Sequence, residues 1–299
     1  MKKVFLLLAL CSLVMFTFMS CQPDEEIYNP KCKISKIWYR SDVGDPNEVY
    51  VYNEKDVLTN IIIDSVETYD FTYNEKEKTV ASIKHVGEKF TETMEMTYTD
   101  QLVDKIIYKV NDTIRKEIMF TRDAETTRIV KIEENYDKSF YELYNILKSS
   151  KMYGSMVDNL QETTERIQRG EKDLVLHSTK KITYYPGKKE TYDNIEKIEE
   201  NYPDLRQDVI RTYEYDTTSY NPFYGLPFAY ADYAGYYLNN KVKETKQTYT
   251  AGVLTREIFY TYSYEGQHYM NDKMYPRQFI TVSSENNAPV HTYILYRKK

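Results

Sequence analysis

Histidine, glycine and cysteine are scarce in this chain of 299 residues, which has 4 His, 9 Gly and 3 Cys. The four histidines stand singly, without a His-Glu-x-x-His zinc motif. No phosphate-binding glycine loop, Gly-x-Ser-x-Gly nucleophile motif or Asp-rich calcium loop occurs either. The sequence therefore predicts no catalytic motif, no metal site and no cofactor. His85 alternates with aliphatic residues, and we expect it to face solvent.

Charge is missing from residues 4–20, an apolar run that follows Lys2 and Lys3. A basic start, an apolar run and a small residue before a cysteine are typical of a secretory signal peptide, and Ser20-Cys21 resembles the bacterial lipobox. We expect residues 1–20 to be removed and Cys21 to carry lipid. The alternative is a transmembrane helix, but the run is barely long enough to span a bilayer and no basic stop signal follows it.

Disulfides are excluded by the same processing. Cys11 would leave with the signal peptide and Cys21 would be acylated, so Cys32 would be the remaining thiol. One thiol forms neither an intrachain disulfide nor a thiolate metal site.

Positive charge is also in deficit, since 40 Lys and Arg face 46 Asp and Glu for a formal net charge of −6. Nucleic-acid binding needs clustered Lys and Arg, so we expect no nucleic-acid partner and membrane contact only through the lipid. Residues 21–30 form an acidic tether with Asp24, Glu25 and Glu26. A tract of this kind resembles the signal that moves Bacteroidetes lipoproteins to the cell surface, although an ordinary solvated tether has the same composition.

Tyrosine is abundant, with 32 residues against a single Trp. Residues 50–55, 71–76 and 96–100 repeat one pattern, in which an aromatic residue or Met, a spacer and a Tyr precede a polar turn and then an aliphatic-x-x-Ile step. The alternating triplet is typical of a strand, and the Asn- or Asp-rich turn indicates a hairpin. The sequence predicts a mainly β fold of repeated antiparallel hairpins that form an extended meander sheet.

A different period occupies residues 138–170, where Phe140, Leu143, Tyr144 and Leu147 have helical spacing and Gly170 ends the stripe. We expect a short helical insert there, with more strand as the alternative. The β-rich domain would cover residues 31–299, either whole or as two lobes, 31–137 and 171–299.

The lipobox, the Tyr-x-Tyr-Asn units and the loop Asn221-Pro222-Phe223-Tyr224-Gly225-Leu226-Pro227 together resemble the gut Bacteroidetes lipoproteins grouped as domain of unknown function 4595. The units also resemble the tyrosine-aspartate repeats of surface toxins. The resemblance implies a β-rich exported lipoprotein and carries no activity. Residues 138–170 depart from the simple repeat.

The same loop is rich in aromatic residues bracketed by Pro222 and Pro227, which restrict its conformations. Flat aromatic faces stack on sugar rings or on protein surfaces, and the alternative is that these rings are core under a long loop. The candidate ligand-binding residues are Phe223, Tyr224, Phe228, Tyr230 and Tyr233.

Carboxylates leave a second function open, because a glycosidase needs only two of them brought together by the fold. The segment Lys-Ile-Glu-Glu-Asn-Tyr occurs at 131–136 and again at 197–202, and we interpret this symmetry as a structural strand end and turn rather than as a catalytic pair. We predict a non-catalytic outer-membrane, cell-surface lipoprotein that binds a glycan, peptide or protein partner. The alternative is an extracellular polysaccharide hydrolase.

Three segments fit a loose Asp-Ser/Thr pattern that resembles the Bacteroidetes O-glycosylation site. The candidate acceptors are Ser65, Thr113 and Thr217.

Overall fold

The computed structural model describes residues 33–74, 79–87, 91–110, 112–138, 140, 174–186, 194–270 and 273–297, with backbone only at 267–270 and 273. The expected signal peptide, Cys21 and the acidic tether lie outside these residues. So does nearly all of the expected helical insert at 138–170. Within the described residues, no helix is long and apolar enough to cross a membrane.

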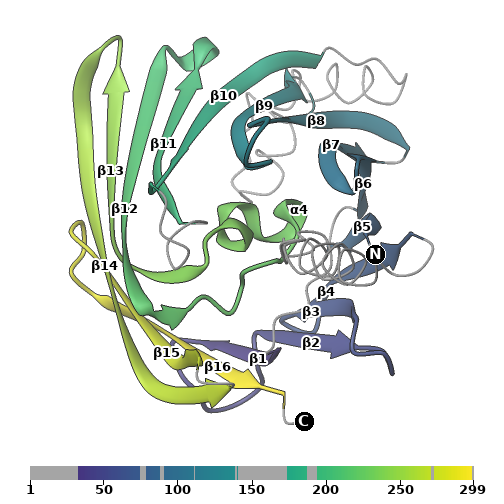
Figure 1. Cartoon of the computed structure of the whole chain (residues 1–299), viewed down its shortest axis with the longest axis vertical. Helices are drawn as coiled ribbons and strands as arrows, with labels where there is room; N and C mark the ends of the chain where they lie inside the picture. Colours follow the sequence, from purple (N-terminus) through teal and green to yellow (C-terminus); the bar gives the residue numbers. More distant parts are fainter. Residues whose placement is uncertain are drawn as a thin grey trace, which may run out of the picture.

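The described chain folds into a closed barrel of sixteen strands that follow one another in chain order, each antiparallel to the next (Figure 1). The strands are β1 (Ile34–Tyr39), β2 (Glu48–Tyr52), β3 (Leu58–Ile63), β4 (Glu67–Tyr73), β5 (Val80–Val86), β6 (Thr91–Thr99), β7 (Leu102–Val110), β8 (Thr113–Arg122), β9 (Ile129–Asp137), β10 (Leu174–Tyr184), β11 (Ile195–Tyr202), β12 (Gln207–Tyr220), β13 (Asn239–Thr250), β14 (Val253–Met270), β15 (Lys273–Ser283) and β16 (Pro289–Tyr296).

The prediction of an open, extended meander sheet was wrong, because the first and last strands pair with each other. In this pairing Ile37 lies opposite Ile294 and Tyr39 opposite Thr292. Sixteen alternating strands leave β1 and β16 antiparallel, so the same ladder that joins each hairpin also joins the two ends. Closure satisfies the backbone groups that two free edges would expose. Strands from both expected lobes belong to this one barrel.

The repeated tyrosines close each hairpin by a contact that we call the tyrosine latch. In it, an inward tyrosine in the second half of an even-numbered strand donates its hydroxyl proton to a backbone carbonyl near the start of the preceding strand. Tyr52 reaches the Ile34 carbonyl at 2.7 Å and Tyr215 reaches that of Ile195 at 2.8 Å. The other latch tyrosines are Tyr73, Tyr98, Tyr184, Tyr264 and Tyr296.

The remaining even-numbered strand, β8, has Arg122 at the latch position, and its guanidinium lies 3.4 Å from the Val103 carbonyl. Because even-numbered strands all run in the same direction, the latches form a ring at one rim of the barrel. This ring uses seven of the 32 tyrosines of the chain.

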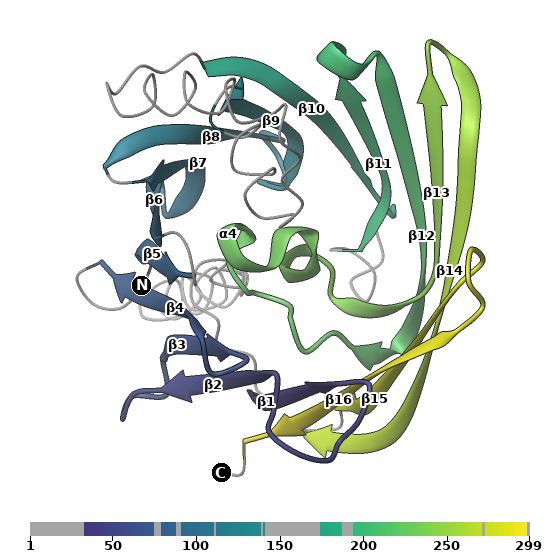
Figure 2. The ribbon, with the colours of Figure 1, turned by 180° about the vertical axis from the view of Figure 1, so that it is seen from behind.

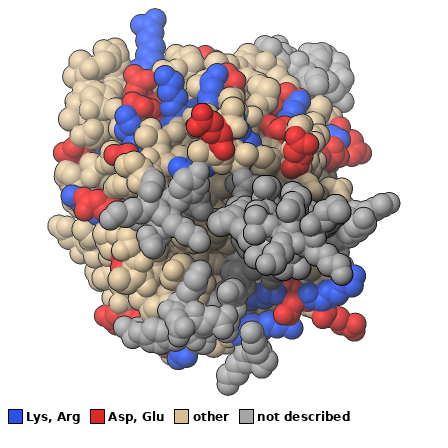
Figure 3. Space-filling view, in the orientation of Figure 1, with Lys and Arg blue, Asp and Glu red and all other residues tan. Residues whose placement is uncertain are grey.

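The outer wall of the barrel carries charge. In β6, Met94 is buried in the core and Met96 packs on it, so Glu95 between them faces outward. Glu95 lies 2.6 Å from Lys109, and Lys131–Glu133 and Lys197–Glu199 are similar outward pairs at 2.9 and 3.1 Å. On the face of the molecule drawn in Figure 3, Lys and Arg lie beside Asp and Glu.

A segment between β12 and β13 fills part of the interior, and we call residues 221–238 the plug. The plug contains α4 (Phe228–Ala231) and η3 (Asp232–Tyr236), and opposite views place α4 inside the ring of strands (Figures 1 and 2). Asn221 holds it together by donating its amide protons to the carbonyls of Ala234 and Tyr237 at 2.7 and 2.9 Å. Gly235 is required here, since a Cβ at this position would lie 2.0 Å from the Leu226 carbonyl oxygen.

Candidate functional site

A cavity of about 410 Å³ lies between the plug and the wall formed by β8 to β13. Its volume is within the usual range of small-molecule sites. Most of its lining side chains are charged or are tyrosines, whereas typical pockets are mainly apolar. The lining residues are Lys116, Glu134, Lys180, Ile195, Glu200, Tyr202, Arg211, Tyr213, Ala231, Asp232, Tyr233, Ala234, Tyr237, Lys241 and Glu244.

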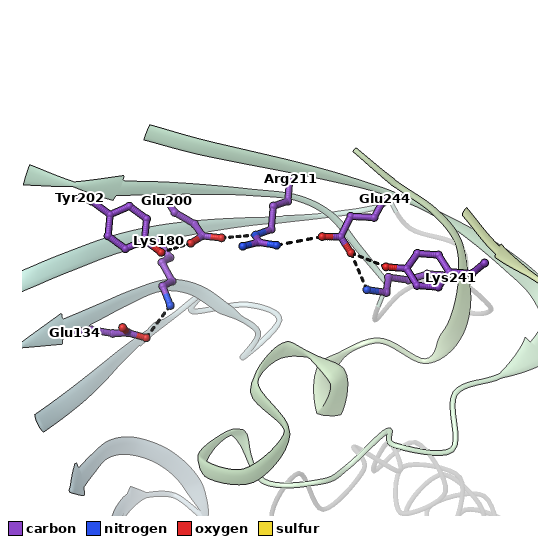
Figure 4. Close-up of polar contacts among 8 residues, drawn as sticks. Glu134, Lys180, Glu200, Tyr202, Arg211, Lys241 and Glu244 are labelled. Carbon is purple, nitrogen blue, oxygen red and sulfur yellow. Dashed lines mark hydrogen bonds and ion pairs between the residues drawn. The ribbon is translucent and has the colours of Figure 1, made fainter. Parts of the chain in front are cut away.

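One end of the cavity wall is built around Glu134 on β9. The Lys180 ammonium donates to its Oε1 at 2.7 Å (Figure 4). Lys116 Nζ lies 3.7 Å from Glu134 Oε2. Burial by itself would raise the pKa of Glu134, but Lys116 and Lys180 outweigh it, so this pKa is lowered. Glu134 is therefore ionised at neutral pH although it is buried.

The other end is a continuous chain of ion pairs across β11, β12 and β13. Arg211 bridges two carboxylates, with Nε 2.6 Å from Glu200 Oε1 and Nη1 3.1 Å from Glu244 Oε1 (Figure 4). Glu244 also accepts from Lys241 at 2.9 Å and from the Tyr262 hydroxyl at 3.0 Å. These charges are mutually satisfied, which is the condition under which buried ions are tolerated.

Lys241 is enclosed by aromatic rings as well as by Glu244. Its ammonium lies 5.3, 5.4 and 4.9 Å from the ring centroids of Tyr213, Tyr237 and Tyr262. Burial by itself would lower the pKa of Lys241, but the phenol of Tyr237 and the carboxylate of Glu244 raise it well above its ordinary value. The cage is thus already occupied by a cation of the protein.

The duplicated Lys-Ile-Glu-Glu-Asn-Tyr segment explains how two of the carboxylates reach this wall. On β9 and β11, which flank β10, Ile132 and Ile198 are fully buried and the second Glu of each copy, Glu134 and Glu200, also faces inward. The first Glu of each copy faces outward and pairs with Lys131 or Lys197. The duplication therefore yields equivalent inward carboxylates on either side of Lys180.

Asp232, at the start of η3 in the plug, faces this wall from the opposite side of the cavity. Among the described residues its carboxylate has no hydrogen bond or ion pair. Its backbone has φ 46° and ψ −133°, a combination that side-chain-bearing residues rarely adopt. Asp232 is exposed to the cavity, but desolvation by the surrounding protein raises its pKa, and Lys180 and Lys116 only partly oppose this.

Three phenols complete the lining of the cavity. The Tyr233 hydroxyl is buried without a hydrogen-bond partner, and the hydroxyls of Tyr213 and Tyr237 make no hydrogen bond to the described residues. Burial raises the pKa of Tyr233 and of Tyr213, so both remain protonated donors. An unsatisfied buried hydroxyl is costly, and a ligand can satisfy it.

The aromatic residues predicted from the sequence are brought together only in part. Tyr233 lines the cavity, whereas Phe228 is 4% exposed and packs edge-on against Phe120 at 5.3 Å. Tyr230 donates its hydroxyl proton to Glu48 at 3.0 Å and contacts the opposite wall. Phe223 and Tyr224 lie in the half-buried first part of the plug. Ligand binding by these five residues stays a prediction.

Other sequence predictions are located as follows. His85 faces the interior rather than solvent, stacked on Tyr69 with ring centroids 4.2 Å apart, so that expectation was wrong. The candidate glycosylation residues Ser65 and Thr217 are exposed and Thr113 is half-buried, and their modification stays a prediction. Within the described ranges, no group of three His, Cys, Asp or Glu side chains is placed to hold a metal ion.

No sequence pattern marked Asp232, whose place in the cavity depends on the plug. Lys180 and Arg211 carried a weak signal, because each stands in the inward phase of its strand together with a core residue, Ile182 on β10 and Tyr213 on β12. Glu244 carried none, since the buried residues of β13 are all polar.

No family model and no curated protein matches this chain. Among solved structures, it resembles a porin-like protein from Bacteroides vulgatus, with TM-score 0.50, 8% identity and coverage of 90% of this chain and 100% of that one. Two further structures, TcdB2-TccC3 without its hypervariable C-terminal region and TcdB2-TccC3-Cdc42, give TM-scores of 0.30 and 0.31 at 11% and 10% identity. The alignments cover 81% and 83% of this chain but 9% and 13% of those chains. The first likeness places the fold in the class of porin-like closed β-barrels.

Proposed function

We propose that this protein is a non-catalytic outer-membrane lipoprotein whose barrel lies in water and binds a small polar molecule inside it. The N-terminal sequence supports attachment through lipid on Cys21, and its acidic tether supports display at the cell surface. The observation that carries the binding function is the 410 Å³ cavity with its charged wall. A glycan, peptide or other partner would be bound inside the barrel rather than on an exposed aromatic surface.

The outward charges argue that the barrel itself stays out of the bilayer. A membrane-spanning barrel has an apolar outer belt, and a Lys at the bilayer midplane costs about 2–4 kcal/mol. Here Lys–Glu pairs occupy the outer face on strands from β6 to β13, including Lys105–Glu117 and Lys243–Glu214 at 3.0 and 3.2 Å. Such a surface suits water, and a lipid anchor would then be the only membrane attachment.

This part of the proposal is tested by Cys21→Ser in a bacterial host that processes lipoproteins. The unchanged protein should sediment with outer membranes and label with palmitate, whereas the variant should be soluble after export. Retention of the variant in membranes through alkaline carbonate washing would show that the barrel inserts, contrary to the proposal.

The binding function is tested with the soluble form that lacks residues 1–21, which retains all sixteen strands. Small polar molecules of several classes are screened for stabilisation of this form against heat, because a ligand of the native state raises the melting temperature. Ala234→Phe, which places a ring in the cavity, should abolish the shift, and Val253→Ala at the exposed start of β14 should not. Equal shifts in both variants, or none with any class, would contradict cavity binding.

A polysaccharide hydrolase remains the second candidate, because the cavity contains carboxylates whose pKa values are displaced in opposite directions. Asp232, with its raised pKa, would be the acid and Glu134, with its lowered pKa, the base or nucleophile. Product release from mixed polysaccharides that stops in Asp232→Asn would favour this function, and no release across a broad panel would remove it.

A further inference from the structure

We propose that the cavity takes an uncharged saccharide, held by the carboxylate of Asp232, the ammonium of Lys116 and the hydroxyls of Tyr213, Tyr233 and Tyr237. This assignment rests on the proposed binding function and names the class of ligand for that same cavity.

The lining excludes an apolar ligand. Only Ile195, Ala231 and Ala234 contribute aliphatic side chains, and the remaining lining residues are polar, charged or tyrosine. A ligand that removed these groups from water without hydrogen bonds would incur their full desolvation cost. The occupant must therefore carry hydrogen-bonding groups over most of its surface.

The charge balance excludes a strongly charged ligand. Four cationic side chains of the lining, Lys116, Lys180, Arg211 and Lys241, face four carboxylates, Glu134, Glu200, Asp232 and Glu244. A polyanion or a polycation would leave one set uncompensated in a partly buried site. The aromatic cage that would suit an ammonium ligand is filled by Lys241.

The lining groups with unused hydrogen-bond donors or acceptors define which donors and acceptors the ligand must have. The carboxylate of Asp232 is an acceptor, and Lys116 keeps donor capacity because its nearest carboxylate oxygen, at 3.7 Å, lies beyond hydrogen-bond distance. The three phenols each donate and accept. Hydroxyl groups, which also donate and accept, match this set at every point, and a ring of adjacent hydroxyls is the chemistry of a saccharide.

The backbone of Asp232 supplies an independent observation. Its φ of 46° and ψ of −133° lie where glycine is normally required, yet a carboxylate-bearing residue occupies the position and faces the cavity. Backbone strain of this kind is concentrated at ligand sites. We infer that the carboxylate is retained at the cost of strain because it contacts the ligand.

The test uses the soluble form lacking residues 1–21 and isothermal titration with four kinds of probe. Maltose, cellobiose and lactose are neutral, digalacturonic acid is anionic, glucosamine is cationic and glycylglycine is zwitterionic. At least one neutral disaccharide should bind, and the charged probes should bind at least tenfold more weakly.

Three variants locate the contact within the site. Asp232→Asn should weaken binding about tenfold or more, since a hydrogen bond to a charged group is lost, and Tyr233→Phe should weaken it several-fold. Asp232→Gly should lose binding while its melting temperature rises, which separates loss of the contact from loss of the fold. Glu214→Gln, an exposed carboxylate on the outer face, is the matched control and should bind as the unchanged protein does.

The outcomes separate the two proposals. Binding of glycylglycine or of a charged probe in preference to the neutral sugars, blocked by Ala234→Phe, would overturn the saccharide assignment and leave the binding function standing. Neutral sugars that bind equally well to Asp232→Asn would remove Asp232 from the site and overturn the inference. No binding by any probe, together with no stabilisation in the wider screen, would overturn both proposals.

Discussion

The interior of the barrel has two walls of different chemistry built on the same backbone repeat. From β1 to β7 the inward residues are largely aliphatic and aromatic, and Ile37, Leu58, Ile61 and Ile83 are completely buried. From β8 to β13 the equivalent positions carry Lys, Glu and Arg that face the cavity. The plug packs against the first wall and against Phe120 on β8, and it leaves space before the rest of the second wall. The comparison shows that the hairpin repeat determines the barrel backbone. The other inward residues of each strand determine whether that wall packs against the plug or lines a cavity.

The largest expected effect on stability comes from the side of the plug that packs against the barrel wall. Phe228→Ala removes a buried ring that contacts Phe120 and Tyr233, and we expect a loss of about 3–5 kcal/mol in the free energy of unfolding. Urea denaturation followed by circular dichroism measures it. Phe259→Ala, on the outer face and 39% exposed, is the control and should change little. Equal losses for both variants would mean that the plug is not anchored by its aromatic residues.

On the polar wall the corresponding change is Glu244→Gln, which leaves Arg211 and Lys241 without a shared carboxylate. We expect a loss of about 3 kcal/mol, the lower end for a broken buried pair, because Arg211 still has Glu200. The same denaturation measurement applies, with Glu257→Gln on the outer face as control. A loss below that of the control would show that the wall charges do not contribute to stability.

The latches are shared by both walls, so they test whether the repeat acts equally in each. Tyr98→Phe on the apolar side and Tyr215→Phe on the polar side each remove one hydroxyl-to-carbonyl hydrogen bond, at 2.5 and 2.8 Å. We expect about 1 kcal/mol for each. A difference of more than twofold between them would mean that the latch depends on the wall around it.

The smallest expected effect is a pH dependence on the apolar wall. Burial would lower the pKa of His85, but Glu92 and Glu67 outweigh it and raise that pKa above its ordinary value of 6.5. A raised native pKa stabilises the fold fully below pH 6.5, and this contribution is lost as pH rises through the native value. The stability difference between the unchanged protein and His85→Gln should therefore shrink from pH 6 to pH 8.

His177, between Tyr136 and Tyr202 near the polar wall, gives the opposite sign. Its pKa is lowered, mainly by burial, so its contribution increases with pH. His177→Gln should therefore change the pH slope in the opposite direction to His85→Gln. Slopes of the same sign would contradict the assignment of the two environments.

The sequence carries the local part of this architecture and not its closure. The strands that carry Tyr50, Phe71 and Met96 could be predicted, because alternation and the Asn or Asp turns are local signals. In the structure these three side chains face inward on β2, β4 and β6. The pairing of Ile37 with Ile294 joins opposite ends of the chain, and no local pattern encodes it. For a similar reason the sequence left two alternatives for the aromatic residues around Pro222 and Pro227, a ligand-binding loop or core under a long loop, because only a surrounding barrel places them inside.

The site shows the same division. The duplicated segment at 131–136 and 197–202 marked Glu134 and Glu200, although as structural residues. Asp232 was not predicted, because its role depends on a backbone conformation and on facing strands distant in sequence. The prediction that His85 faces solvent was wrong because alternation defines two faces of a strand and does not indicate which face lies inside the barrel.

The ring of latches also bears on how such a barrel can change in size. Each latch joins only the two strands of one hairpin, so every hairpin contains its own latch hydrogen bond. A hairpin can therefore be added or deleted as a unit. An even strand count is preserved at every such step, which keeps the terminal strands able to pair. Arg122 shows that a hairpin can form with a residue other than tyrosine at the latch position. Duplication of whole hairpins can thus change the circumference of the barrel and with it the internal volume.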